Sequence, residues 1–108
     1  MFVVVYEMKV KEGRLAQFEK SWAEVTDFIY KRCGSLGSRL HKTDVDRVYI
    51  AYAQWPSKEQ YFLEHNDAIS DEETLSREAM VDSTEEIKTL YHMEVVDNRV
   101  QRKMYEHS

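Results

Sequence analysis

The chain has 108 residues, of which 43% are hydrophobic and 32% are charged, and its formal net charge is −5 at pH 7. This composition is typical of one soluble globular domain, and the scattered lysines and arginines argue against a nucleic-acid partner, which would require a basic face. No run approaches the roughly 20 apolar residues of a membrane span, and the opening segment lacks the pattern of a signal peptide, so no membrane partner is expected.

Residues 2–10 are predicted to form the first strand, because apolar residues alternate along them. The face that is apolar throughout consists of Phe2, Val4, Tyr6, Met8 and Val10. Glu12-Gly13 ends this strand, and a helix is predicted over about residues 14–32. Its apolar stripe recurs at spacings of three and four residues and contains Leu15, Phe18, Trp22, Val25 and Ile29. Gly34 is expected to end the helix as a C-cap glycine.

The stretch of residues 34–56 predicts an antiparallel hairpin, with a polar turn at residues 43–46 between two alternating strands. The second strand is apolar on both faces. One face consists of Val48, Ile50 and Tyr52, and the other of Tyr49, Ala51, Ala53 and Trp55. A strand with two apolar faces must be covered on both sides.

Two capping boxes predict two short helices after the hairpin. In the first, Ser57 is followed three residues later by Gln60, and in the second, Ser70 is followed by Glu73. The acidic run of residues 71–73 is interpreted as the solvated first turn of the second helix rather than as a metal site.

The last strand is predicted over about residues 89–97. A third candidate capping box, from Ser83 to Glu86, predicts a bend or a helical restart before this strand. The charged segment 99–108 is interpreted as a tail outside the folded domain, which would span residues 1–98.

The predicted element order is β-α-β-β-α-(α)-β, which is the order of an α+β, ferredoxin-like fold with a four-stranded antiparallel sheet. In such a fold the helices cover one face of the sheet and leave the other face bare. Here the bare face would also be apolar, which is more than soluble monomers normally expose. We therefore expect a two-fold homodimer in which the two sheets pack face to face and form a dimeric α+β barrel.

Few residues show the spacing of a catalytic or metal site. The segment 34–38 matches neither a nucleophile elbow nor a phosphate-binding loop, since it precedes a strand. No metal site is predicted, because none of the histidines has a metal-ligand spacing; they are His41, His65, His92 and His107. Cys33 is the single cysteine, which excludes an internal disulfide and is typical of a cytoplasmic protein.

The predicted strands are rich in aromatic residues that carry a polar group. They are Tyr6, Tyr49, Tyr52, Trp55 and Tyr91. Several such side chains between a sheet and its helices would line a pocket for a flat, partly polar ligand. A small dimeric barrel also needs large side chains to fill its volume, so both interpretations stay open. For Trp22, core packing is the simpler interpretation.

Up to about residue 98, the chain resembles the antibiotic biosynthesis monooxygenase superfamily of dimeric α+β barrels. The features that match are the first strand with Glu12-Gly13, the helix residues Phe18 and Trp22, the segment 34–37, and Gln54-Trp55-Pro56-Ser57 before Glu59. Members of this superfamily include oxygenases of polyketide quinols that use no metal or flavin, haem-degrading enzymes and quinol oxygenases. The resemblance therefore implies the fold more specifically than the activity.

For the haem-degrading branch, the resemblance implies an Asn, a Trp and a His at places that hold Tyr6, Glu64 and about Thr74 here. Haem degradation is therefore not expected. For the polyketide branch, the resemblance implies pocket Tyr, Trp and Asn side chains that hold a phenol and stabilise its anion. Tyr6, Tyr52 and Trp55 are the nearest equivalents by residue type, and only Trp55 matches by motif.

Two functional hypotheses remain. One is a cofactor-independent monooxygenase that acts on a small aromatic or quinol substrate, and the other is a non-catalytic homodimer that binds a small ligand or only assembles. Under the first hypothesis, the expected substrate-binding residues are Tyr6, Trp22, Trp55 and, if Tyr52 meets the partner subunit instead, Tyr49. The catalytic candidates are Tyr52 and, as proton acceptors at the edge of the pocket, His41 or His65.

Overall fold

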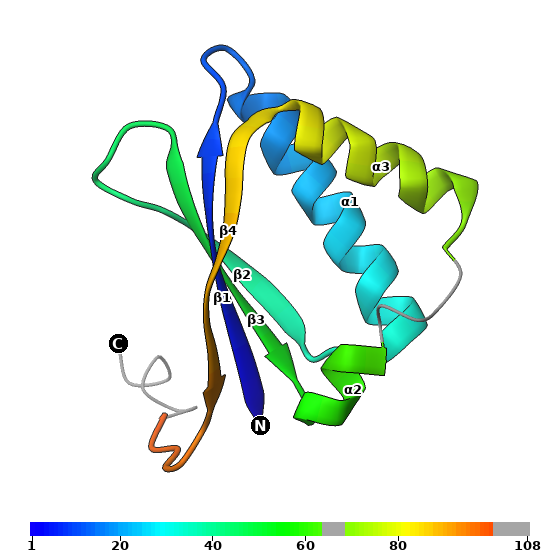
Figure 1. Ribbon diagram of the computed structural model, residues 1–108, viewed down its shortest axis with the longest axis vertical. Coiled ribbons are helices and arrows are strands. Elements are labelled where there is room, and N and C mark those ends of the chain that lie inside the picture. The colour runs from blue at the N-terminus through cyan, green and yellow to red at the C-terminus, as the bar shows by residue number, and fades with distance from the viewer. Residues whose placement is uncertain (64–68, 101–108) are drawn as a thin grey trace, which may run out of the picture.

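The computed structural model describes residues 1–63 and 69–100, and within them the predicted order of elements is confirmed (Figure 1). The strands are β1 (Phe2–Val10), β2 (Gly37–Lys42), β3 (Val48–Trp55) and β4 (Thr84–Glu94). The helices are α1 (Leu15–Cys33), α2 (Lys58–Leu63) and α3 (Asp71–Asp82). The strands form one antiparallel sheet in the order β2-β3-β1-β4, as predicted for a ferredoxin-like fold.

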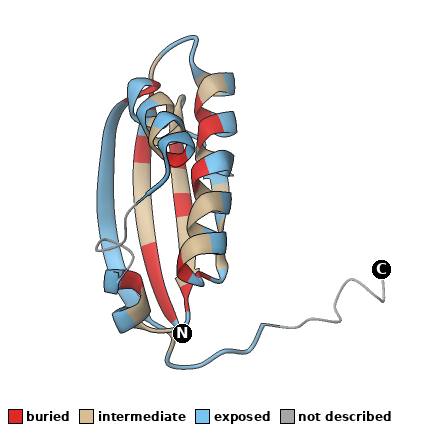
Figure 2. Cartoon of the chain, turned by 90° about the vertical axis from the view of Figure 1, so that its right-hand side faces the viewer, coloured by how far each residue is buried: buried red, intermediate tan, exposed pale blue. Residues whose placement is uncertain are grey.

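The described helices lie on one face of this sheet (Figure 2). Helices α1 and α3 run side by side across it, and α2 lies at the end of β3 (Figure 1). In the register of the sheet, Phe2 of β1 is opposite Trp55 of β3, and Tyr6 is opposite Ala51. These residues contact the helices, so the face predicted to be apolar throughout is the one that the helices cover.

The core between the sheet and the helices consists of two clusters. The Trp55 cluster contains Phe2, Val4, Cys33, Trp55 and Tyr61, and the Phe18 cluster contains Met8, Val10, Phe18, Tyr49 and Ala51. Tyr6 packs against both clusters from the middle of β1.

The predicted helix ends are largely confirmed. Gly34 follows α1 in a left-handed conformation with φ of 69°, which a glycine adopts without steric cost. The Oγ of Ser57 accepts a hydrogen bond from the backbone N of Gln60, and the Oγ of Ser70 accepts one from the backbone N of Glu73. Each serine therefore satisfies one of the backbone donors at a helix start.

Of the bend or helical restart predicted at residues 83–86, the restart is wrong, because α3 leads into β4 through a turn at Ser83. The Oγ atoms of Ser83 and Thr84 donate to carbonyl oxygens in the last turn of α3, so these residues end a helix and do not begin one. Thr84 is already paired with Val10 of β1. The last strand thus starts five residues before its predicted position, at residue 84 instead of 89.

The acidic run of residues 71–73 was predicted to be a solvated helical turn, and the structure corrects this prediction, because the run is only partly solvated. Asp71 and Glu72 are exposed, whereas Glu73 is 1% exposed. Two arginines hold the carboxylate of Glu73 between α1 and α3. A carboxylate can be buried in this way when it is paired with cations.

The second face of the sheet is not covered by any described helix (Figure 2). The centre of this open face is apolar and is formed, as the strand register shows, by Val3, Val5, Ile50, Tyr52, Tyr91 and Met93. Beyond β4, the chain runs away from the sheet, and Val96 and Val100 are almost fully exposed. Within residues 1–63 and 69–100, no helix combines the length and the apolar character needed to cross a membrane.

Candidate ligand-binding pocket

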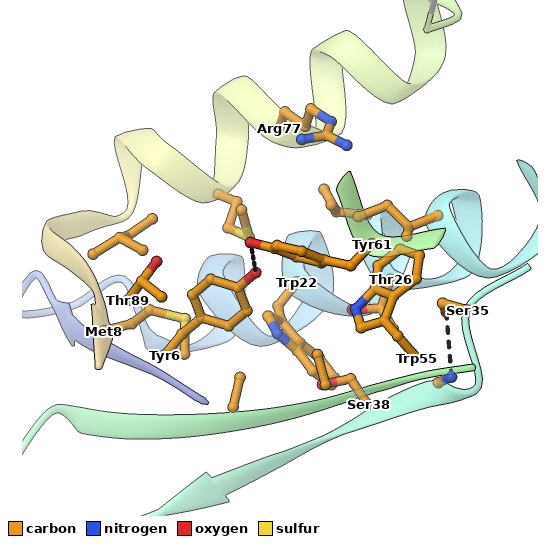
Figure 3. Close-up of a pocket in the computed structure, with 17 residues that line it drawn as sticks. Tyr6, Met8, Trp22, Thr26, Ser35, Ser38, Trp55, Tyr61, Arg77 and Thr89 are labelled. Carbon is orange, nitrogen blue, oxygen red and sulfur yellow. Dashed lines mark hydrogen bonds between the residues drawn. The ribbon is translucent and has the colours of Figure 1, made fainter. Parts of the chain in front are cut away.

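A pocket of about 320 Å³ lies between the sheet and the helices (Figure 3). Its volume is at the lower end of the range for small-molecule sites, which is about 300–1,000 Å³. The described residues that line the pocket are mostly apolar or aromatic, with a few hydroxyl groups and one arginine: Tyr6, Met8, Trp22, Val25, Thr26, Ile29, Ser35, Gly37, Ser38, Ala51, Ala53, Trp55, Tyr61, Arg77, Met80, Ile87 and Thr89. The space is therefore suited to a small, largely apolar ligand.

Four aromatic side chains from four elements surround the pocket. Tyr6 comes from the middle of β1, Trp22 from α1, Trp55 from the end of β3 and Tyr61 from α2. Tyr6, Trp22 and Trp55 are three of the residues predicted to line a cavity here. Their positions follow from the covered face of the sheet and the apolar stripe of α1.

Tyr61 is the aromatic residue that the sequence interpretation missed. Its hydroxyl is hydrogen-bonded to that of Tyr6, with 3.2 Å between the two oxygens, so two phenol groups meet at the pocket wall (Figure 3). The Tyr61 ring packs edge-on against Trp55 at a centroid distance of 5.4 Å and lies 5.7 Å from the Phe2 ring. These contacts hold the short helix α2 against the end of the sheet.

The indole nitrogen of Trp55 is a buried donor without a hydrogen-bond partner among the described residues. Trp55 itself is 4% exposed, and its ring is part of the pocket wall (Figure 3). Buried donors in folded proteins are nearly always paired, so an unpaired one calls for an explanation. Because almost none of its surface is accessible, this nitrogen does not face the open volume of the pocket.

Arg77 of α3 lies on the helix side of the pocket and is held there by Glu73. The Nη2 and Nε atoms of Arg77 lie 2.8 and 2.9 Å from Oε2 of Glu73. Arg32 of α1 contacts both carboxylate oxygens, at 3.1 and 3.0 Å. Burial alone would raise the pKa of Glu73, but the hydrogen bonds and charges of the two arginines outweigh burial and keep this pKa below its usual value of 4.5.

Tyr52 and Tyr49 were expected to supply a pocket residue, but neither side chain is among the described residues that line the pocket. Tyr52 is opposite Val5 in the sheet register and therefore lies on the open face. No bulge in β3 changes the alternation between Tyr52 and Trp55, so the two residues lie on opposite faces.

Tyr49 does face the helices, but it belongs to the Phe18 cluster. Its ring packs 4.9 Å from that of Phe18, and its hydroxyl donates a hydrogen bond of 2.5 Å to Glu19. Burial, together with the hydrogen bond to Glu19 and the negative charge of that residue, raises the pKa of Tyr49 to about 12. The Tyr49 side chain is thus neutral and packed in the core, and its hydroxyl already has a partner.

The structure describes only one of the two predicted proton acceptors. His41 pairs with Ile50 across the strands, which places it on the open face, and it is exposed there. His65 lies outside the described residues. In the described part of the chain, no group of three or more His, Cys, Asp or Glu side chains is arranged to hold a metal ion.

Two sequence signals pointed to the residues that were missed. Tyr61 falls on the first turn of the helix that Ser57 was predicted to cap. Arg77 is four residues after Glu73, a spacing at which a helix brings opposite charges together. Neither signal indicates a pocket, because the partners of these residues come from distant parts of the chain.

A comparison with protein-family models identifies the family of this chain. The sequence model of the antibiotic biosynthesis monooxygenase family matches residues 1–70, which span β1 to α2 and contain all four pocket aromatics. The chain belongs to the antibiotic biosynthesis monooxygenase family. A comparison with curated proteins finds no significant match.

Several solved structures share the fold of this antibiotic biosynthesis monooxygenase domain. One is a variant of SnoaB, a cofactor-independent oxygenase from Streptomyces nogalater, with a TM-score of 0.72 and 16% identity over 93% of this chain and 97% of that one. Another is a putative antibiotic biosynthesis monooxygenase from Caulobacter crescentus, with a TM-score of 0.71 and 18% identity over 89% and 90%. A third, from Bordetella bronchiseptica, has a TM-score of 0.70 and 19% identity over 88% and 96%. At these identities the likeness concerns the fold alone.

Proposed function

We propose that this chain is a cofactor-independent monooxygenase that acts on a small aromatic or quinol substrate in the pocket described above. The observation that carries the proposal is a mostly apolar pocket lined by Tyr6, Trp22, Trp55 and Tyr61 in a chain of the antibiotic biosynthesis monooxygenase family. The name of SnoaB, which describes it as a cofactor-independent oxygenase, supports the same reaction class.

The proposed chemistry begins with a substrate that binds as its phenolate anion. Electrons from the anion reduce oxygen, one oxygen atom enters the ring, and the other leaves as water when the ring becomes a quinone. One hydroxyl of the Tyr6–Tyr61 pair would donate to the phenolate oxygen as negative charge shifts on it, while the other proton stays in the hydrogen bond within the pair. The apolar walls would exclude water from the reacting anion.

A proton acceptor is also needed, because a phenol is largely protonated at neutral pH. His41 is exposed on the opposite face of the sheet from the pocket. We therefore retain His65 as the proposed acceptor, since an imidazole titrates near neutral pH.

Oxygen uptake with a panel of naphthalene and anthracene quinols tests the proposal. The intact protein should accelerate uptake of one oxygen molecule per quinol oxidised, and Tyr6→Phe or Tyr61→Phe should lower the rate by about 100-fold, which is typical for the loss of a donor to a developing anion. Tyr52→Phe is the matched control, because it removes a hydroxyl on the open face. Uptake that never exceeds the rate without protein, or that Tyr52→Phe lowers as much as the pocket variants, would refute the proposal.

We further propose that the functional unit is a homodimer formed through the open face of the sheet. Its apolar centre, which includes Val5 and Ile50, would then be covered by the same face of a second copy. Light scattering should give about twice the chain mass of 12.9 kDa. A stable mass of one chain would contradict the dimer, and Ile50→Glu, which places a charge in this centre, should unfold the protein.

A second candidate function is ligand binding without catalysis. It is favoured by the absence of Asp, Glu and His among the described residues that line the pocket, since these residues most often transfer protons in active sites. Saturable binding of a quinol without oxygen uptake would support this candidate over the monooxygenase.

A further inference from the structure

Helix α1 contributes two polar side chains to the pocket wall, those of Trp22 and Thr26 (Figure 3). They are four residues apart, a spacing that places side chains next to each other on one face of a helix. The other α1 residues that line the pocket are the apolar Val25 and Ile29. The indole N–H of Trp22 and the hydroxyl of Thr26 are therefore neighbouring polar groups on an otherwise apolar wall.

Both polar groups lack a hydrogen-bond partner among the described residues. A hydroxyl inside a helix often donates to a carbonyl of the preceding turn, as the Ser21 hydroxyl does to the carbonyl of Gln17 at 2.7 Å. Thr26 makes no such bond within the described part of the chain. Neither group is fully buried, in contrast to the indole nitrogen of Trp55, so each keeps surface from which a hydrogen bond to a ligand can form.

The chemistry of these two groups restricts what they can bind. An indole N–H only donates a hydrogen bond, whereas a threonine hydroxyl can donate and accept. Neither group is charged, so an uncharged oxygen of a ligand, which has two lone pairs, is a suitable partner for both. An apolar group at the same place would displace water from the two donors without replacing its hydrogen bonds, and this lowers affinity.

A different part of the pocket wall holds the hydrogen-bonded hydroxyls of Tyr6 and Tyr61, which come from β1 and α2. We propose that Trp22 and Thr26 orient the ligand by binding a second, uncharged oxygen on the ring edge that faces α1, while a phenol oxygen meets the tyrosine pair. The inference rests on the proposed function, because it concerns the substrate of the same pocket. It adds two residues that determine specificity and an acceptor that a simple phenol lacks.

Calorimetric titration without oxygen tests this inference with 6-methoxy-2-naphthol and 6-ethyl-2-naphthol. The two compounds have the same phenol group and nearly the same size, but the first has an ether oxygen where the second has a methylene group. The ratio of their affinities therefore reports on the acceptor. Trp22→Phe and Thr26→Val should each lower this ratio by about threefold or more, as expected for the loss of one hydrogen bond.

Thr26→Ser keeps the hydroxyl and should keep the ratio close to that of the intact protein. Thr74→Val is the matched control, because it makes the same substitution on α3 at a residue that does not line this pocket, and it should leave the ratio unchanged. An unchanged ratio in folded Trp22→Phe or Thr26→Val protein would overturn the inference. A fall of equal size in Thr74→Val, or no binding of either compound to the intact protein, would also overturn it.

The outcome is separable from that of the proposed reaction. A ratio that depends on Trp22 and Thr26, without oxygen uptake by any quinol, would leave the inference standing and refute the monooxygenase. Oxygen uptake by the intact protein, with a ratio that neither substitution changes, would do the reverse.

Discussion

The Phe18 cluster and the Trp55 cluster lie on the same face of one sheet and contain similar residues, but they differ in how their polar groups are satisfied. At the Phe18 end, the Tyr49 hydroxyl donates to Glu19, and its ring packs against Phe18. At the Trp55 end, the indole N–H has no partner among the described residues, and the ring borders a cavity. The comparison indicates that the aromatic residues of the Phe18 cluster fill the core, whereas Trp55 and Tyr61 border a pocket.

The largest expected effect is a loss of stability when the Phe18 cluster is disrupted. Phe18 is fully buried, so Phe18→Ala should lower the free energy of unfolding by about 3–5 kcal/mol, the usual cost of deleting a buried ring. Trp22→Phe, which trims a ring at the pocket, should cost less than about 1.5 kcal/mol. Urea denaturation of both variants checks the difference. Equal costs would mean that the pocket wall at Trp22, which packs against the Phe18 cluster, is as tightly packed as the centre of that cluster.

The next effect concerns the network that holds α3 over the pocket. Glu73→Gln should cost about 3 kcal/mol, because it leaves two partly buried arginines without their carboxylate. The folded-state pKa of Glu73 is lowered, so its contribution is complete above its usual pKa of 4.5 and is lost as the pH falls through the folded value. The variant should therefore lose less stability than the intact protein on acidification below about pH 5, measured by urea denaturation. Identical acid dependence of the two proteins would exclude this role.

A smaller effect should distinguish Tyr49 from the pocket tyrosines. Tyr49→Phe removes the hydrogen bond to Glu19 and should cost about 1 kcal/mol at neutral pH. The pKa of Tyr49 is raised to about 12 in the folded state, so the unfolded chain releases this proton first, and stability should fall between about pH 10 and pH 12. Tyr49→Phe should reduce this alkaline loss, whereas Tyr61→Phe should not. Alkaline denaturation curves that are the same for all three proteins would contradict the assignment.

Much of the fold followed from local patterns in the sequence. Alternation defined the covered face of β1 and the hairpin, and Gly34, Ser57 and Ser70 marked helix ends because their capping chemistry is local. The start of β4 did not follow, since the hydroxyls of Ser83 and Thr84 have the same sequence signature at the end of a helix as at its start.

The pocket was only half predictable. Tyr6 and Trp22 could be assigned to it because strand parity and helix periodicity indicate the side to which each side chain points, and Trp55 because it lies in the segment that carries the family resemblance. Tyr61 and Arg77 could not, because their places depend on how α2 and α3 pack, through contacts to Tyr6 and Glu73. Parity also left open which face of β3 the helices would cover, and this choice places Tyr52 on the open face.

The most direct test of the difference between the Phe18 cluster and the Trp55 cluster is to follow the indole N–H signals by nuclear magnetic resonance. The chain has two tryptophans, so Trp22→Phe assigns the signal of Trp55. Titration with 2-naphthol under anaerobic conditions should shift the Trp55 indole signal in a saturable way, because an aromatic ligand in the pocket lies against its ring, while the amide signals of Phe18 and Tyr49 stay in place. A Trp55 signal that does not move at saturation, or shifts centred on Phe18 and Tyr49, would contradict the claim that the Trp55 end is the ligand site.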